Sequence, residues 1–232
     1  HKGFIPWDDD MDLNLTRTDY EKFIQYFDND LGDKYDLLAP GYKKGSICFL
    51  MRILKKNTVL LNMIDESSPY PTGIYIDITP IDYAPNGKIA QKIKGIGADV
   101  FRFISYSVYW RQYSSRSLEE FMTHSEGRTY YKLRMATGAV FSFRTSEQWF
   151  QTFDKFILGK ESNYVTVAAG RKKYCGEIYH KDTFFPLKKI PFEGRQIYVY
   201  NKVGKYLKGL YGDYMKIPNP EDREKHLCLQ LD

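Results

Sequence analysis

The sequence predicts an α/β (α+β) protein with a helical middle region. Segments rich in β-forming residues lie toward both ends of the chain, whereas apolar residues recur at helical spacing between about residues 87 and 143. A composition of 43% apolar and 27% charged residues is typical of a folded protein and excludes disorder as the main state. The 232 residues leave room for one generous domain, and no linker divides them, so we expect a single domain over residues 1–232.

The first informative segment is expected to form a strand over residues 5–15, followed by a tight turn and a helix. An extended chain places Asp8, Asp10, Asp12 and Asn14 on one face and Asp9, Met11, Leu13 and Leu15 on the other, so one face can pack while the other carries charge. A helix is expected to begin near Thr18, because residues 18–21 form a capping box and apolar residues then recur at helical spacing.

Three further strands are expected in the next part of the chain. Residues 46–54 and 58–64 are rich in β-forming residues and are separated by a short Lys-Lys-Asn segment, which predicts a hairpin. In residues 73–79 the isoleucines share one face and Asp77 lies on the other. Pro80 is expected to end this strand, because proline cannot donate a ladder hydrogen bond.

The second half of the chain is expected to alternate between helices and strands. Its expected elements are helices over about 87–113 and 118–143, a helix opened by a capping box at 145–148, strands over 164–168 and 196–200, and a helix over 205–211. Gly212 is expected to end the last helix.

Asp8, Asp9, Asp10 and Asp12 form the densest cluster of like charges in the sequence. Same-face neighbours on a strand lie about 7 Å apart, so each adjacent ionised pair costs roughly 2–3 kcal/mol at an effective dielectric of about 20. A bound cation would offset this repulsion, and hard oxygen ligands select Mg²⁺ or Mn²⁺. An acidic surface turn is the alternative, but the apolar residues interleaved with the cluster favour a partly buried strand.

Asp77 is a second candidate for the same site. It lies in mid-strand between two isoleucines, where burial of a carboxylate is costly without a partner. If this strand lies beside that of Asp10, Asp77 becomes a third metal ligand or a general base for an incoming hydroxyl. A carboxylate on a solvated sheet face is the alternative. Asp82 is a weaker candidate, because the strand is expected to end before it.

Several cations could neutralise a diphosphate, namely Arg17, Arg171, Lys172 and Lys173. Each is weak evidence by itself, because such residues are usually solvated. The net charge of +5 is compatible with phosphate-bearing ligands, anionic membrane surfaces or nucleic acid. The three cysteines and four histidines show no metal-ligand spacing, and no Walker A loop or nucleophile elbow is present.

Three motifs of the sequence resemble those of a known family. The run His-Lys-Gly-Phe-Ile-Pro-Trp-Asp-Asp-Asp-Met-Asp over residues 1–12, with residues 17–23 after it, resembles the signature of the LicD family of phosphotransferases, relatives of fukutin and the fukutin-related protein. Residues 76–82 look like the second acidic motif of that family, and residues 191–194 with 206–215 look like its C-terminal block. The middle of the chain, from about 88 to 160, is not diagnostic.

The resemblance implies a nucleotidyltransferase-like mixed β-sheet flanked by helices. By motif, Asp10 and Asp12 map to the metal-binding acid pair and Asp77 to the third acid, with Asp8 as an additional ligand. Family members carry a helix and a glycine-containing turn before the His-Lys-Gly run. We therefore expect residues 1–232 to be a LicD-like catalytic domain without that N-terminal helix and glycine turn.

The resemblance also implies a reaction. We expect a Mg²⁺- or Mn²⁺-dependent transfer of a phosphorylated small alcohol, such as phosphocholine, from a CDP-linked donor to a sugar of a glycan or lipid-linked glycan, as in teichoic acid or lipopolysaccharide precursors. A nucleotidyltransferase that leaves the nucleoside monophosphate on the acceptor is one alternative. A non-enzymatic glycan- or nucleic-acid-binding module is another; because the acidic cluster would repel polyanions, no nucleic acid partner is expected.

The expected location is the cytoplasm. No run approaches the 18 or so uninterrupted apolar residues that a membrane-spanning helix needs. Acceptors in the family are often lipid-linked, so the expectation extends to peripheral contact with the inner face of the membrane.

Overall fold

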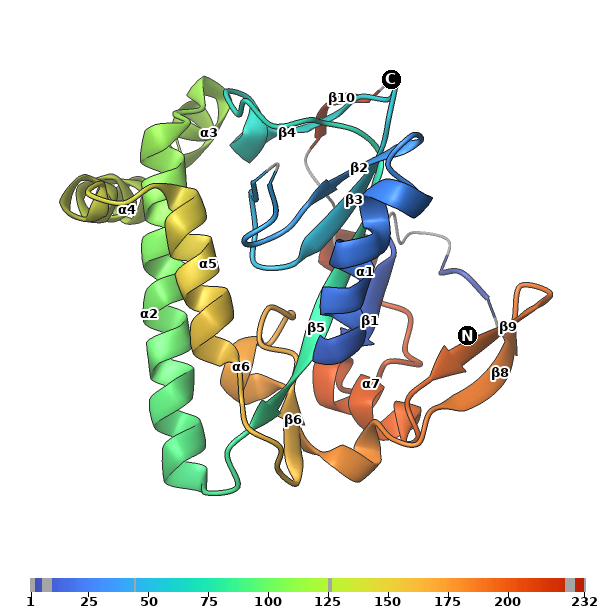
Figure 1. Cartoon of the computed structure of the whole chain (residues 1–232). Coiled ribbons are helices and arrows are strands. Elements are labelled where there is room, and N and C mark those ends of the chain that lie inside the picture. Colours follow the sequence, from blue (N-terminus) through green and yellow to red (C-terminus); the bar gives the residue numbers. More distant parts are fainter. Residues whose placement is uncertain (1–2, 6–9, 44, 125–126, 224–227, 232) are drawn as a thin grey trace.

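A six-stranded mixed sheet forms the centre of the molecule (Figure 1). The computed structural model describes residues 3–5, 10–43, 45–124, 127–223 and 228–231. The sheet consists of β1 (Asp12–Thr16), β2 (Tyr35–Leu38), β3 (Met51–Lys55), β5 (Tyr75–Ala84), β6 (Tyr164–Thr166) and β7 (Ile178–His180), in the order β2-β3-β5-β6-β7 with β1 beside β5. The β1–β5 pair is parallel, whereas the other pairs in this sheet are antiparallel. The predicted α+β class with a mixed sheet is therefore confirmed.

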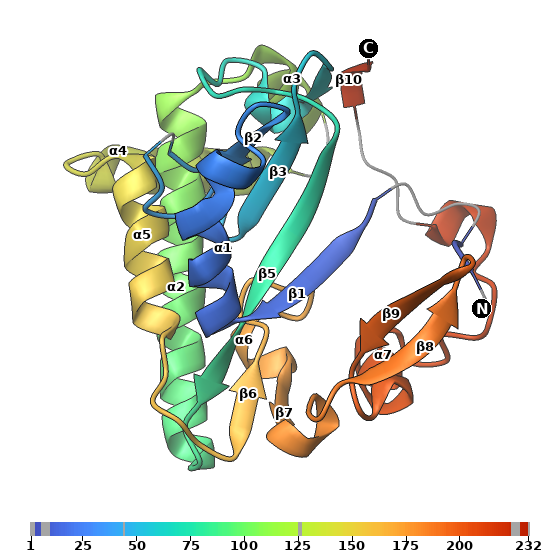
Figure 2. The ribbon, with the colours of Figure 1, turned by 45° about the vertical axis from the view of Figure 1, so that its right-hand side comes forward.

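Helices flank this sheet. They are α1 (Arg17–Asp30), α2 (Lys88–Gln112), α3 (Arg116–Thr123), α4 (Arg128–Phe141), α5 (Ser146–Ile157), α6 (Lys173–Gly176) and α7 (Val203–Tyr211). The long α2 runs beside α5 along one side of the molecule, and α7 lies on the far side of the sheet from them (Figures 1 and 2). The predicted helices over 87–113 and 205–211 are confirmed, and the predicted helix over 118–143 is divided into α3 and α4.

Two small sheets lie outside the main one. β4 (Leu60–Asn62) pairs with β10 (Cys228–Leu231), and β8 (Lys188–Phe192) pairs with β9 (Arg195–Val199). The predicted hairpin between residues 46–54 and 58–64 is wrong, because β3 pairs with β2 and β5 and not with β4. A segment rich in β-forming residues is predicted to be extended, but contacts with distant parts of the chain determine which strand it pairs with.

The first helix begins at Arg17, and its N-cap lies two residues before the Thr18 that the sequence indicates. Thr16, the last residue of β1, is the N-cap of α1, and its side chain accepts a hydrogen bond from the backbone N–H of Asp19. The predicted start near Thr18 is therefore displaced, because the nearer threonine satisfies the free N–H groups of the first turn. The predicted strand over 5–15 is observed as β1 from residue 12, and residues 6–9 lie outside the described residues.

The predicted end of the third strand at Pro80 is wrong. β5 runs from Tyr75 through Pro80 to Ala84. Residues 75–78 of β5 pair with β3 and residues 82–84 pair with β6, so Pro80 falls between these two ladders. The missing N–H of Pro80 therefore removes no hydrogen bond from the ladder with β3 or from the ladder with β6.

Turn and cap chemistry explain the C-terminal elements. The capping box predicted at residues 145–148 is present in full at the start of α5, and Gly212 ends α7 with φ of +69°. The segment between the strands expected over 164–168 and 196–200 contains α6, β7 and β8. Glu193 and Gly194, which join β8 to β9, both have positive φ, as a two-residue turn of the type I′ class requires.

Alternation along the strands decides which residues pack beneath α1. Leu15 of β1, Met51 of β3 and Ile78 of β5 belong to one apolar cluster with Tyr20 and Phe27 of α1. The side chains between these positions point to the opposite face of the sheet, away from α1. No helix in the described part of the chain is both long and apolar enough to cross a membrane.

A buried ion-pair cluster fixes the start of α1. Arg17 donates through Nε and Nη2 to the two carboxylate oxygens of Asp82, at 2.8 and 2.7 Å, and through Nη1 to Asp154 of α5 at 2.8 Å. Asp82 is 1% exposed. Burial would lower the pKa of Arg17, but the hydrogen bonds and charges of the two aspartates raise it above its ordinary value. One side chain thus connects α1, β5 and α5.

Replacement of Asp82 by Asn should destabilise the protein. It leaves the Arg17 guanidinium buried with only one carboxylate, and breaking a buried pair in this way typically costs about 3–5 kcal/mol. Urea denaturation followed by circular dichroism measures the loss. Asp182→Asn is the matched control, because Asp182 is about half exposed beside Lys202 and its loss should change stability far less. Equal losses in the two variants would contradict the role of Asp82.

Candidate functional site

Two acidic residues predicted from separate motifs lie opposite each other in the sheet. The parallel register of β1 and β5 pairs Asp12 with Asp77 and Asn14 with Thr79. Neighbouring strands lie about 4.8 Å apart, and residues paired across them point to the same face. These four residues, which we call the acidic face, therefore form one patch on the side of the sheet away from α1.

Asp77 is held in a fixed orientation by Arg52 of β3. The register of β3 and β5 places Arg52 directly beside Asp77. Arg52 donates from Nε and Nη2 to the two carboxylate oxygens, both at 2.8 Å, and its guanidinium lies 3.7 Å from the ring centroid of Tyr75. Burial would lower the pKa of Arg52, but the hydrogen bond to Asp77 raises it well above its ordinary value. Each carboxylate oxygen still has a second lone pair for another ligand.

Asn14 brings an oxygen without a partner to the acidic face. Its Oδ1 is buried and accepts no hydrogen bond from any residue that the structure describes. A buried polar atom of this kind is costly unless a ligand or water satisfies it. Tyr200 lies nearby: burial raises the pKa of its hydroxyl, and the side chains of Tyr206 and Asn14 oppose this rise.

The remaining predicted metal ligands are only partly described. Asp10 is exposed just before β1, and its charge contributes to a raised pKa of Tyr75, of which burial is the main cause. Asp8 lies outside the described residues. Among the residues described, no three His, Cys, Asp or Glu side chains lie together closely enough to hold a metal ion. The acidic face therefore offers two in-register carboxylates and the amide oxygen of Asn14 as its oxygen donors.

The predicted phosphate-binding residues lie apart from the acidic face. Arg17 is occupied by Asp82 and Asp154. The guanidinium of Arg171 lies 5.5 Å from the ring centroid of Tyr211, and Lys172 donates through Nζ to the backbone oxygen of Gly209 at 2.6 Å. Both side chains therefore contact α7.

The weaker candidate Asp82 is excluded from the acidic face by strand alternation. It lies five residues after Asp77 on β5, an odd spacing that places the two carboxylates on opposite faces. Asp82 points toward α1 and is neutralised by Arg17. The sequence motif places both aspartates within a few residues, but the pleat of the strand separates them.

A cleft that the sequence did not indicate lies beside Asp77. It has a volume of about 380 Å³, and Arg52 and Tyr75 form part of its wall. Asp65, in the 3₁₀ turn Met63–Asp65, also lines it and accepts a hydrogen bond from the hydroxyl of Tyr109 at 2.9 Å. Burial raises the pKa of Asp65, while the hydrogen bond from Tyr109 and the charge of Arg52 oppose the rise. A lone aspartate after an apolar run gives no sequence signal for such a role.

The fold and the site together define an α+β protein with an acidic sheet face beside an open cleft. Over 97% of its length the chain is 24% identical to the lipopolysaccharide cholinephosphotransferase LicD of Haemophilus influenzae, and the match covers 81% of that protein. This similarity agrees with the resemblance to the LicD family that the three motifs carry. No family model and no solved structure match the chain.

The geometry around Asp77 predicts that Arg52 cannot be replaced by lysine without loss. Lysine keeps the charge but can neither form the two-pronged hydrogen bond nor stack on Tyr75, so Arg52→Lys should lower the free energy of unfolding by about 1–3 kcal/mol. Urea denaturation measures the change. Arg116→Lys is the control, because Arg116 is 88% exposed and its pair with Glu120 lies on the surface. A loss no larger than that of the control would contradict the inferred fit.

Proposed function

We propose that this protein transfers phosphocholine from CDP-choline, or a similar phosphorylated alcohol from a CDP-linked donor, to a sugar of a lipopolysaccharide precursor. The nearly full-length match to a cholinephosphotransferase supports a phosphotransferase enzyme. The observation that carries the proposal is the register of β1 and β5, which brings the acids of two distant family motifs to one face. A teichoic acid precursor is the corresponding acceptor in organisms that lack lipopolysaccharide.

We propose that the acidic face binds Mg²⁺ or Mn²⁺. Asp12 and Asp77 would hold the ion, with Asp10 and Asp8 from the preceding segment. The unpartnered oxygen of Asn14 supports this assignment, because carboxylate and amide oxygens are suitable ligands for hard cations. When bound, such an ion neutralises the charge that develops on the phosphates during transfer.

The protein's own contribution is positioning. The two hydrogen bonds from Arg52 fix the plane of the Asp77 carboxylate. A carboxylate held in this way can orient an acceptor hydroxyl toward the phosphorus. Arg52 itself lines the cleft and brings a cation close to where a diphosphate would lie. Phosphoryl transfer depends largely on such positioning and charge neutralisation.

Replacement of the motif acids tests this proposal. Asp10→Asn and Asp12→Asn should each lower the release of CMP from CDP-choline by about 100-fold or more, because an electrostatic group at the reacting centre is lost. Both should weaken Mg²⁺ binding without loss of thermal stability, since removing one charge relieves repulsion. Asp182→Asn is the control, because Asp182 is about half exposed and lies outside the three motifs in sequence.

Two results would count against the proposal. Full turnover in either variant would overturn the metal assignment. An acceptor product that has gained the mass of a nucleoside monophosphate, and not that of phosphocholine, would replace the proposed reaction with nucleotide transfer.

We further propose a cytoplasmic location with contact to the inner face of the membrane. One face of α2 supports this: Ile89, Ile93, Ile96 and Val100 follow helical spacing and are 50–78% exposed. Residues 88–100, which span this stripe, include three lysines and one acid, Asp99. An apolar stripe flanked by lysines matches an anionic lipid surface, whereas a second copy of the same basic face would be repelled.

Vesicle binding tests this contact. The double variant Ile93→Asp with Ile96→Asp should bind vesicles of phosphatidylglycerol at least about ten-fold more weakly than the unchanged protein, because two apolar side chains no longer enter the bilayer. Ile217→Asp is the control, since Ile217 is 60% exposed outside the stripe. Equal co-sedimentation of the double variant and the control would contradict the proposal.

A further inference from the structure

The cleft beside Asp77 is lined by residues from several elements of the chain. Arg52 and Tyr75 come from β3 and β5, Asp65 from the turn after β4, and Tyr106 and Phe121 from α2 and α3. Because Arg52 and Tyr75 also surround Asp77, the cleft opens directly beside the acidic face.

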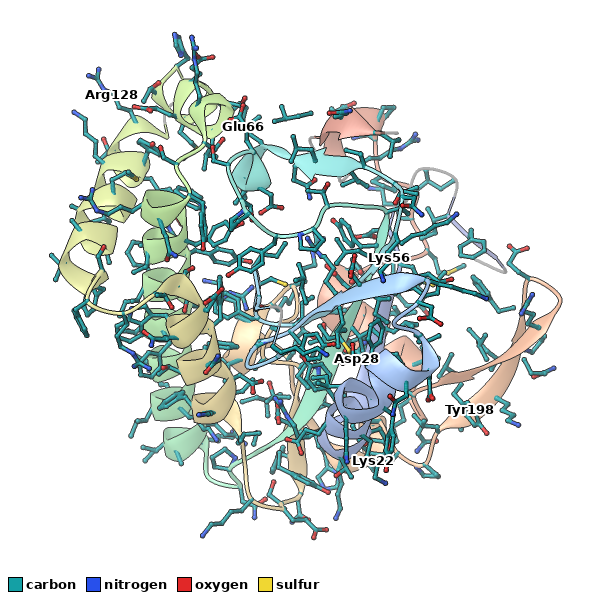
Figure 3. The ribbon with its side chains drawn as sticks, turned by 45° about the horizontal axis from the view of Figure 1, so that its top comes forward. Lys22, Asp28, Lys56, Glu66, Arg128 and Tyr198 are labelled. Atoms are coloured by element: carbon teal, nitrogen blue, oxygen red, sulfur yellow. The ribbon has the colours of Figure 1, made fainter. Side chains whose placement is uncertain are left out.

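The turn that carries Asp65 is anchored to α3. The next residue, Glu66, accepts hydrogen bonds from the hydroxyl groups of Ser115 and Ser117 and from the backbone N–H of Ser117, each at 2.9 Å. These bonds lower the pKa of Glu66. Figure 3 shows Glu66 on the side of the molecule where this turn meets α3. The wall with Asp65 is thus preformed and does not depend on a ligand for its position.

Asp65 gives the cleft a negative charge, and no lysine or arginine in the described part of the chain forms an ion pair with it. The Arg52 guanidinium, the cation nearest to Asp65 in the cleft wall, makes its hydrogen bonds to Asp77. Neutral groups supply the hydrogen bonds to Asp65, from the Tyr109 hydroxyl and the Asn62 amide. A positively charged ligand would therefore complement this site.

Apart from Asn62, Cys48 and Met63, the rest of the lining is aromatic and aliphatic. Tyr75, Tyr106 and Phe121 contribute rings, and Ile47 and Leu118 contribute aliphatic surface. Aromatic faces attract a cation through their quadrupole, and methyl groups pack against aliphatic side chains. A primary ammonium would lose strong hydrogen bonds to water on entering such a cleft, whereas a quaternary ammonium has none to lose.

We propose that this cleft is the subsite for the trimethylammonium head of the transferred group. The inference rests on the proposed function, because it places the phosphate of phosphocholine at Arg52 and Asp77 and its head group between Asp65 and the aromatic rings. The cleft then selects the head group, while the acidic face carries out the transfer. Asp65 is accordingly a specificity residue and not a catalytic one.

Equilibrium binding tests this proposal without turnover. Isothermal titration calorimetry with choline chloride, at constant ionic strength and without donor or metal, should show binding that Phe121→Ala and Asp65→Asn each weaken at least ten-fold. Phe143→Ala is the matched control, because Phe121 and Phe143 are both exposed but only Phe121 lines the cleft. A thermal melt checks that the Asp65→Asn variant is folded. If that variant is unfolded, the test rests on Phe121→Ala, because Phe121 is more exposed and its replacement is less disruptive.

The outcomes separate this proposal from the proposed function. Choline binding that neither variant weakens, or ethanolamine binding as tight as choline binding, would overturn the subsite even if the enzyme turns over. Cytidine that displaces choline competitively would assign the cleft to the base of the donor and overturn the proposal as well. Choline binding that depends on Asp65 and Phe121 supports the subsite even if no CMP release is found.

Discussion

The parallel pairing of β1 with β5 is the constraint on which the site depends. The strands that carry Asp12 and Asp77 are far apart in the sequence, and their register alone places the two carboxylates side by side. A shift of one residue would turn one of the acids toward α1, where Leu15 and Ile78 now pack. One register determines which side chains lie on each face of the sheet. The burial of the apolar residues beneath α1 therefore also fixes the positions of the acids on the opposite face.

The acids in the sheet and in the cleft beside it differ in how the protein compensates their negative charge. Asp82 has two hydrogen bonds from a buried arginine and points into the protein, so its role is structural. Asp77 also has an arginine fork, but it stands beside Asp12 and borders an open cleft. Asp65 depends on neutral donors for its hydrogen bonds. Asp77 and Asp65 both retain lone pairs toward a ligand, and the proposals assign Asp77 to the transfer and Asp65 to the selection of the head group.

Local sequence signals predicted the elements well, and the pairing of those elements poorly. The capping box at Thr145 and the glycine after α7 are satisfied by a few neighbouring residues, so both were predictable. The partner of β3 and the passage of β5 through Pro80 depend on distant strands, which no local pattern encodes. The family motifs predicted the acids at the site, but the cleft with Asp65 arises from segments that only tertiary packing brings together.

The Arg17 cluster affects how the protein unfolds locally. Because a single guanidinium ties the first turn of α1 to β5 and to α5, these three elements cannot separate one at a time without exposing a buried charge. They therefore form one cooperative unit, whose amide protons exchange with solvent only when the whole unit unfolds. β1 ends in the residue that caps α1, so the scaffold beneath the acids shares the slow exchange of this unit and stays rigid through local fluctuations elsewhere.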